Sequence, residues 1–121
     1  MQVLDTVELL HLSGLIYCED LADRKFNAPH HFMVVNPSTG NDICKIDFQE
    51  GPIKEVGNNG VKDEELIAMI IARLEAFQES EYSCSENAVA LEYLYAALHA
   101  LNLRTNRRTN ENTEGTNIKD K

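Results

Sequence analysis

Residues 63–103 read DEELIAMIIARLEAFQESEYSCSENAVALEYLYAALHALNL, and the first part of this stretch predicts an amphipathic helix. Its large apolar residues recur at i, i+3 and i+4 spacing, which places them along one face of a helix: Leu66, Ile67, Ile70, Ile71, Leu74 and Phe77. The acidic run Asp63-Glu64-Glu65 precedes them, and carboxylates in a first turn interact favourably with the helix dipole. We therefore expect a helix from Asp63 to Phe77 or Gln78.

A second helix follows after a short connection. Ser83 with Glu86 three residues later is a capping-box pattern, and leucines then recur at near-heptad spacing up to Leu101. So short a connection makes the two helices antiparallel, as a helical hairpin. The second helix is also rich in alanines, which permit close packing against a second copy of the chain: Ala88, Ala90, Ala96, Ala97 and Ala100.

The segment before the helices has strand character. Residues 31–35 and 43–48 are separated by turn-forming residues, which predicts a β-hairpin with Cys44, Ile46 and Phe48 on a buried face. Residues 15–18 favour a further strand, 19–25 a polar helical turn, and 7–12 either a strand or a turn of helix. The expected fold is α+β: an N-terminal antiparallel β-hairpin or sheet followed by a C-terminal antiparallel two-helix hairpin. We expect residues 1–121 to form a single domain with a β-rich part (6–48), a helical hairpin (62–108) and a tail (109–121).

Composition narrows the possible functions. The chain of 121 residues carries 20 acidic and 11 basic side chains, a net charge of −9, which argues against binding of DNA or RNA polymers. No apolar run approaches the roughly 20 residues that span a membrane, and the N-terminus lacks the basic start of a secretory signal. Three widely spaced cysteines favour reduced thiols, so we expect a cytoplasmic protein without a disulfide framework.

A basic cluster ends the second helix. Residues 1–103 contain 6 basic and 17 acidic residues, whereas residues 104–121 contain 5 and 3. Arg104 and Arg108 are four positions apart and share a helix face, with Arg107 beside them. Two interpretations stand: the guanidinium groups bind a phosphate-containing anion, or they complement the negative end of the helix dipole.

Other candidate residues have less support. His30-His31 suggests a metal site, but no nearby residue has ligand spacing, so we expect a strand entry and no metal. Lys54 is either an anion contact or the partner of Glu50 or Glu55, and Gly57 with Asn59-Gly60 forms either an anion-binding nest or only a turn. The sequence contains no recognisable catalytic triad, P-loop or dinucleotide fingerprint, so we expect neither catalysis nor a cofactor.

Across residues 31–116 the chain resembles the type-one phage Thoeris anti-defence family. The resemblance rests on motifs in a fixed order: residues 48–55 (FQEGPIKE), Asn59-Gly60, Arg73-Leu74, Phe77-Gln78, Glu86-Asn87-Ala88, Arg104-Thr105, Arg108 and Glu114-Gly115-Thr116. Members of this family are sponges in the cytoplasm of the infected bacterial host. They bind the cyclic ADP-ribose signal of the Thoeris system without degrading it, and some also bind cyclic di- or trinucleotides of the CBASS system in a different pocket of a hexamer built from dimers.

The resemblance implies a set of ligand-binding residues. Phe77 would stack on adenine and Asn87 would hydrogen-bond the base or ribose, while Arg104 and Arg108, with Thr105 beside them, would hold the diphosphate. Lys54 is a further candidate, outside this set, either as a contact for a cyclic oligonucleotide or as the partner of Glu50 or Glu55. The alternatives to a sponge are an enzyme that cleaves such signals and a helical-hairpin module that binds a protein partner.

Helix length constrains this site. Seventeen positions separate Asn87 from Arg104, which corresponds to about 25 Å along a helix. One ligand of ADP-ribose size cannot contact both residues on one helix, so we expect each site to combine two antiparallel protomers, with two sites per homodimer. Residues 109–116 would then close over bound ligand as a lid and exclude water.

Overall fold

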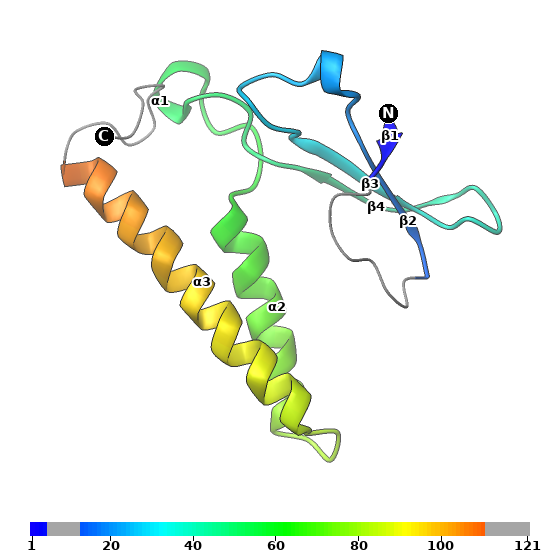
Figure 1. Cartoon of the computed structure of the whole chain (residues 1–121), viewed down its shortest axis with the longest axis vertical. Coiled ribbons are helices and arrows are strands. Elements are labelled where there is room, and N and C mark those ends of the chain that lie inside the picture. Colours follow the sequence, from blue (N-terminus) through cyan, green and yellow to red (C-terminus); the bar gives the residue numbers. More distant parts are fainter. Residues whose placement is uncertain (5–12, 111–121) are drawn as a thin grey trace. The chain divides into compact units, whose positions relative to one another are not determined.

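The computed structural model describes residues 1–4 and 13–110, with two compact units, Met1–Val61 and Lys62–Lys121. The first unit is built on a four-stranded antiparallel sheet, ordered β1-β2-β3-β4 (Figure 1). The strands are β1 (Gln2–Val3), β2 (Leu15–Cys18), β3 (His31–Val35) and β4 (Asp42–Asp47), and a 3-10 turn, η1 (Leu21–Asp23), follows β2. The predicted hairpin, the strand at 15–18 and the helical turn in 19–25 are confirmed. The prediction for residues 7–12 lies outside the described residues.

Few of the described side chains of the sheet are completely buried. Cys18 at the end of β2 is fully buried, and the Phe32 and Phe48 rings meet edge to face with centroids 5.5 Å apart. The predicted buried face of β4 is only partly correct. Ile46 and Phe48 are half-buried but Cys44 is exposed, because β4 is the edge strand and a small side chain nearer its outer end lacks packing partners.

Residues 49–60 form a pinned loop that carries the short helix α1 (Ile53–Val56). Gln49 donates its backbone N–H to the Val61 carbonyl, and its side-chain amide donates to the carbonyls of Gly51 and Gly57. Asn59 accepts the Glu50 N–H through Oδ1 and donates from Nδ2 to the Glu50 carbonyl, each at 2.8 Å. The loop is therefore held in large part by side-chain amides.

The second unit is the predicted helical hairpin, α2 (Asp63–Gln78) and α3 (Ser85–Asn110) (Figure 1). Ile71 is buried, and the half-buried residues of both helices follow heptad spacing: Leu66, Ile67 and Leu74 on α2, and Leu91, Leu94, Leu98 and Leu101 on α3. The Tyr95 hydroxyl on α3 donates to the Glu75 carboxylate on α2, and this hydrogen bond raises the pKa of Tyr95. Ile70 and Phe77, predicted on the packed stripe, are instead 48% and 37% exposed. With one partner helix, the packed stripe is narrower than the apolar stripe of the sequence.

The turn between the helices differs from the prediction at its cap. Helix α3 begins at Ser85, so Cys84 and not Ser83 precedes it, and the Cys84 thiol accepts the Asn87 N–H at 3.5 Å. The Gln78 side chain fixes this register, because its amide accepts the Cys84 N–H at 3.0 Å and donates to the Cys84 carbonyl at 2.9 Å.

Within the described residues, no helix is long and apolar enough to cross a membrane.

Candidate functional site

The tip of the hairpin carries an open groove around Phe77. The groove has a volume of about 640 Å³ and is lined by small, aromatic and cationic residues: Ala72, Arg73, Ala76, Phe77, Ser80 and Tyr82. The Arg73 guanidinium carbon lies 5.2 Å from the centre of the Phe77 ring, a cation–π contact. Small alanines leave the ring accessible, and Tyr82 adds a second, largely exposed aromatic surface. This combination suits a flat, partly polar ligand group.

Asn87 lies in the first turn of α3, at the same end of the hairpin. It is half-buried, and its backbone N–H is used in the cap with Cys84. Asn87 is not among the residues that line the Phe77 groove. The structure thus brings the two predicted base-binding residues to one end of the hairpin without placing them in one pocket.

The predicted phosphate-binding residues lie at the opposite end of α3. Arg104 is exposed, Thr105 is half-buried and Arg108 is only 5% exposed. A guanidinium group is costly to bury without compensation, and each arginine of this cluster, Arg107 included, does take part in an interaction. Helix α3 continues to Asn110, beyond the predicted boundary at residue 108, and Thr109 in this last turn donates its hydroxyl to the Thr105 carbonyl at 2.9 Å.

The two halves of the predicted site are far apart within one hairpin. Helix α3 is continuous over 26 residues and α2 has 16, so α3 extends well beyond the start of its partner (Figure 1). The 17 positions between Asn87 and Arg104 therefore span about 25 Å of uninterrupted helix. A single hairpin separates Phe77 and Asn87 from Arg104, Thr105 and Arg108.

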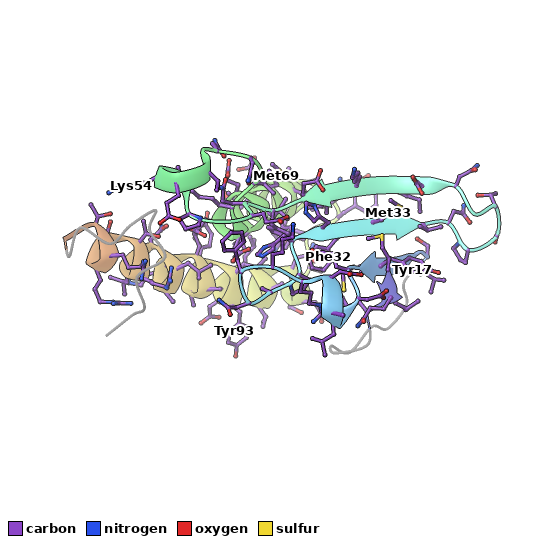
Figure 2. The ribbon with its side chains drawn as sticks, turned by 90° about the horizontal axis from the view of Figure 1, so that it is seen from above. Tyr17, Phe32, Met33, Lys54, Met69 and Tyr93 are labelled. Carbon is purple, nitrogen blue, oxygen red and sulfur yellow. The ribbon has the colours of Figure 1, made fainter. Side chains whose placement is uncertain are left out.

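Lys54 belongs to the first unit, where it projects from α1 and is exposed (Figure 2). The Glu50 carboxylate, one of its two proposed partners, is bonded to His31 instead. Gly57 has a positive φ of 81°, but the Asn59 N–H is already donated to Gln49 Oε1 at 3.0 Å. One of the backbone amides that an anion-binding nest would need is therefore already used within the loop.

The two histidines are used within the first unit. His30 is buried and its Nε2 lies 2.6 Å from the Lys25 carbonyl oxygen, while His31 lies between the carboxylates of Asp47 and Glu50. Within residues 1–4 and 13–110, no cluster of three His, Cys, Asp or Glu side chains has the geometry of a metal site. The proposed lid, residues 109–116, falls almost wholly outside the described residues.

Sequence reasoning missed two features near these sites. Arg73 and Tyr82 line the groove beside Phe77, and the i, i+4 spacing of Arg73 and Phe77 was the signal for their contact. The bridging of His31 by two carboxylates had no such signal, because Asp47 and Glu50 are 16 and 19 positions away.

Comparison with known proteins places these residues in context. Residues 40–106 match the family model described as the Acb2/Tad1 hairpin domain, which includes the whole of α2 and most of α3. A relative named Thoeris anti-defense 1, from Bacillus phage SBSphiJ7, is 40% identical over 127 aligned positions, covering 86% of this chain and 89% of the relative. Phe77, Asn87, Arg104, Thr105 and Lys54 all lie inside the matched family region, and Arg108 lies just beyond it.

Proposed function

The chain belongs to the Acb2/Tad1 family, and from this premise we propose that it is a sponge that binds cyclic ADP-ribose immune signals and holds them intact. Its role is in phage anti-defence, in line with the name of the relative from phage SBSphiJ7. Sequestration would keep the signal from the Thoeris effector. The observation that supports this proposal most is the 40% identity over nearly the whole length of both chains.

The chemistry of the candidate residues favours binding over cleavage. Phe77 offers an accessible ring for base stacking, Asn87 an amide, and Arg104 and Arg108 planar guanidinium groups that match phosphate oxygens. A phenyl ring, an amide and a guanidinium do not change their protonation state near neutral pH, so none of them is suited to act there as a general acid or base. These groups would hold a ligand without processing it.

Phe77 and Asn87 lie at one end of the hairpin, and Arg104 and Arg108 lie at the other end of α3. This separation supports a site that is shared between two protomers. The face of α3 opposite its packed leucines carries a second heptad stripe of apolar residues: Val89, Tyr93, Ala96, Ala100 and Leu103. Val89 is 51%, Tyr93 71% and Leu103 55% exposed, and Tyr93 points outward from α3 (Figure 2). A second α3 packed antiparallel on this stripe would bring the hairpin tip of one protomer toward the arginines of the other.

We propose that Lys54 contacts a second kind of anionic ligand, a cyclic di- or trinucleotide of the CBASS type. Lys54 is exposed on α1, in a different unit from the hairpin residues. Simultaneous binding of both ligand classes to one assembly, observed by native mass spectrometry, would support a separate site.

Recovery of the ligand separates a sponge from an enzyme. The protein is incubated with cyclic ADP-ribose isomers, denatured, and the released small molecules are identified by mass spectrometry. A sponge returns the signal unchanged in proportion to the protein, whereas an enzyme returns a linear or hydrolysed product. A protein-interaction module would return nothing bound and would show no ligand-induced rise in Tm.

A further inference from the structure

His31 is held by two carboxylates, one at each ring nitrogen. Nδ1 lies 2.8 Å from Asp47 Oδ1, and Nε2 contacts Glu50 Oε2. Asp47 is the cross-strand neighbour of His31 in the β3–β4 register, whereas Glu50 follows β4 in the pinned loop. The ring thus joins the sheet to the loop.

The hydrogen-bond count fixes the protonation of this cluster. An ionised carboxylate only accepts hydrogen bonds, and a neutral imidazole donates from a single nitrogen. Two contacts between one ring and two carboxylates therefore need two protons, and because a carboxyl group is a stronger acid than an imidazolium, both protons reside on the ring. The hydrogen bonds with Asp47 and Glu50 accordingly raise the pKa of His31 above its ordinary value.

Further charges surround the ring. Glu19, after β2, accepts the backbone N–H groups of His30 and His31 at 3.0 and 2.9 Å, and its carboxylate also favours the charged form of His31. Burial raises the pKa of Glu19, but these backbone hydrogen bonds outweigh it and leave the pKa below its usual value. The charged and titratable groups of this cluster, within the described residues, are Glu19, Arg24, His30, Asp47 and Glu50.

Glu50 is the link through which His31 acts on the loop. Both backbone polar groups of Glu50 are bonded to the Asn59 side chain, so its position and that of Asn59 are coupled. The next residue, Gly51, has a φ of +88° and leaves no room for a Cβ beside the Phe26 ring, which would lie 2.9 Å away. A shift of Glu50 would therefore change the packing of the loop against Phe26.

We propose that His31, protonated on both ring nitrogens, is a positioning residue that holds residues 49–60 on the sheet, and that loss of one proton releases this loop. The His31 side chain is 42% exposed and that of Asp47 43%, so protons exchange with solvent without prior unfolding. Deprotonation leaves one nitrogen unable to donate and places a lone pair against a carboxylate. The loop carries Lys54, so this proton would also control how that side chain is presented.

The direction of the pH effect follows from the raised pKa. A group whose pKa is higher in the folded state contributes stability below its unfolded pKa, which is about 6.5 for histidine. That contribution is lost as the pH rises through the folded-state value. The loop should therefore be most firmly held in mildly acidic solution and loosen in alkaline solution. Glu19 acts in the opposite sense, but only as the pH falls below the ordinary range of carboxylates.

Two measurements on the full chain test this inference. The first is ¹⁵N NMR of the His31 ring between pH 5 and 9, which should show a titration midpoint above the ordinary histidine value of about 6.5, with both nitrogens protonated below that midpoint. The second is hydrogen exchange of the Glu50, Asn59 and Val61 amides, corrected for intrinsic rates. Their protection should fall above the His31 midpoint, by roughly tenfold for each pKa unit that the two contacts add. The Met33 and Val34 amides in the central strand should stay protected.

Variants separate positioning from mere stability. In H31Q the three loop amides should be weakly protected at every pH, and E50Q should lower the His31 midpoint while leaving the sheet intact. H99Q, which removes an exposed histidine on α3, is the matched control and should keep the wild-type profile. A His31 midpoint at or below about 6.5, loop protection that is independent of pH, or a wild-type pH profile in H31Q would each overturn the proposal. If H31Q does not fold, the wild-type titration and exchange series still decide it.

Discussion

At the scale of single residues, aromatic and guanidinium groups meet at the Phe77 groove. The ring is 37% exposed and Arg73 lies over it, so part of its surface is available for a ligand. A planar base can stack on the face that Arg73 leaves open or displace the guanidinium toward a phosphate. Either arrangement makes the ring the main source of stacking energy.

Removal of that ring should weaken ligand binding far more than it weakens the fold. Base stacking on an aromatic side chain contributes about 1–3 kcal/mol, so F77A should raise the Kd for the cyclic ADP-ribose signal by roughly 5- to 150-fold in calorimetry. F77W restores a π surface and should bind nearly as well as the wild type, whereas F77L supplies only apolar volume and should not. Equal binding by F77L and F77W would exclude stacking. Thermal unfolding of each variant checks that the hairpin is intact.

At the scale of elements, the sequence predicted the helices better than their ends. The apolar periodicity of residues 66–77 placed α2 correctly from Asp63 to Gln78, because heptad spacing reflects packing on a partner helix. The α3 cap was wrong, since Ser83 fits the capping pattern but Gln78 binds both backbone groups of Cys84 and sets the helix start one residue later. These two hydrogen bonds join residues that are six positions apart, a spacing that no sequence pattern indicates.

The cap gives a prediction about α3. Serine is a stronger N-cap than a thiol, and a good cap is worth about 0.5–2 kcal/mol relative to alanine. C84S should therefore raise the Tm, while S83A should leave it unchanged. The sequence pattern alone predicts instead that Ser83 is the cap and that S83A lowers the Tm. Differential scanning calorimetry of the two variants checks this prediction. A large loss of stability in S83A would show that Ser83 caps the helix, as the sequence pattern predicted.

The candidate site was less predictable than the fold, because its surroundings also depend on contacts between residues that are distant in the sequence. Sequence resemblance supplied Phe77, Asn87, Arg104 and Arg108, but the residues that surround them depend on tertiary contacts. Tyr82 joins the groove only because the inter-helix turn places it there, and Arg108 is buried although arginine is usually exposed. His31 is the clearest example, since its partners are brought together by strand register and loop closure.

At the scale of the whole molecule, the length of α3 makes assembly a requirement of the proposed site. About 25 Å of helix separates Asn87 from Arg104, and the exposed stripe that includes Tyr93 and Leu103 offers a surface for a second helix. Both observations predict that each site is built from two protomers. A functional test must therefore show that one chain supplies the aromatic half and another the arginine half.

Complementation between two inactive variants provides that test. F77A lacks the stacking half, and R104A/R108A lacks the phosphate half, so neither homodimer should bind the signal tightly. In a mixed dimer, the intact Phe77 of one protomer and the intact arginines of the other should reconstitute one of the two sites. Random mixing at equal concentrations makes half of the dimers mixed, so the binding stoichiometry should recover to about a quarter of the wild-type value.

The outcome separates the two geometries because a site contained within one protomer cannot be rescued by mixing. Co-refolding allows the protomers to exchange, and native mass spectrometry counts the mixed dimers while calorimetry counts the sites. Y93E, placed on the exposed stripe, should abolish both association and binding, whereas E92K on the neighbouring helix position should preserve association. Mixed dimers that form in the expected amount but bind no ligand would refute the shared site, and tight binding by the monomeric Y93E variant would do so equally.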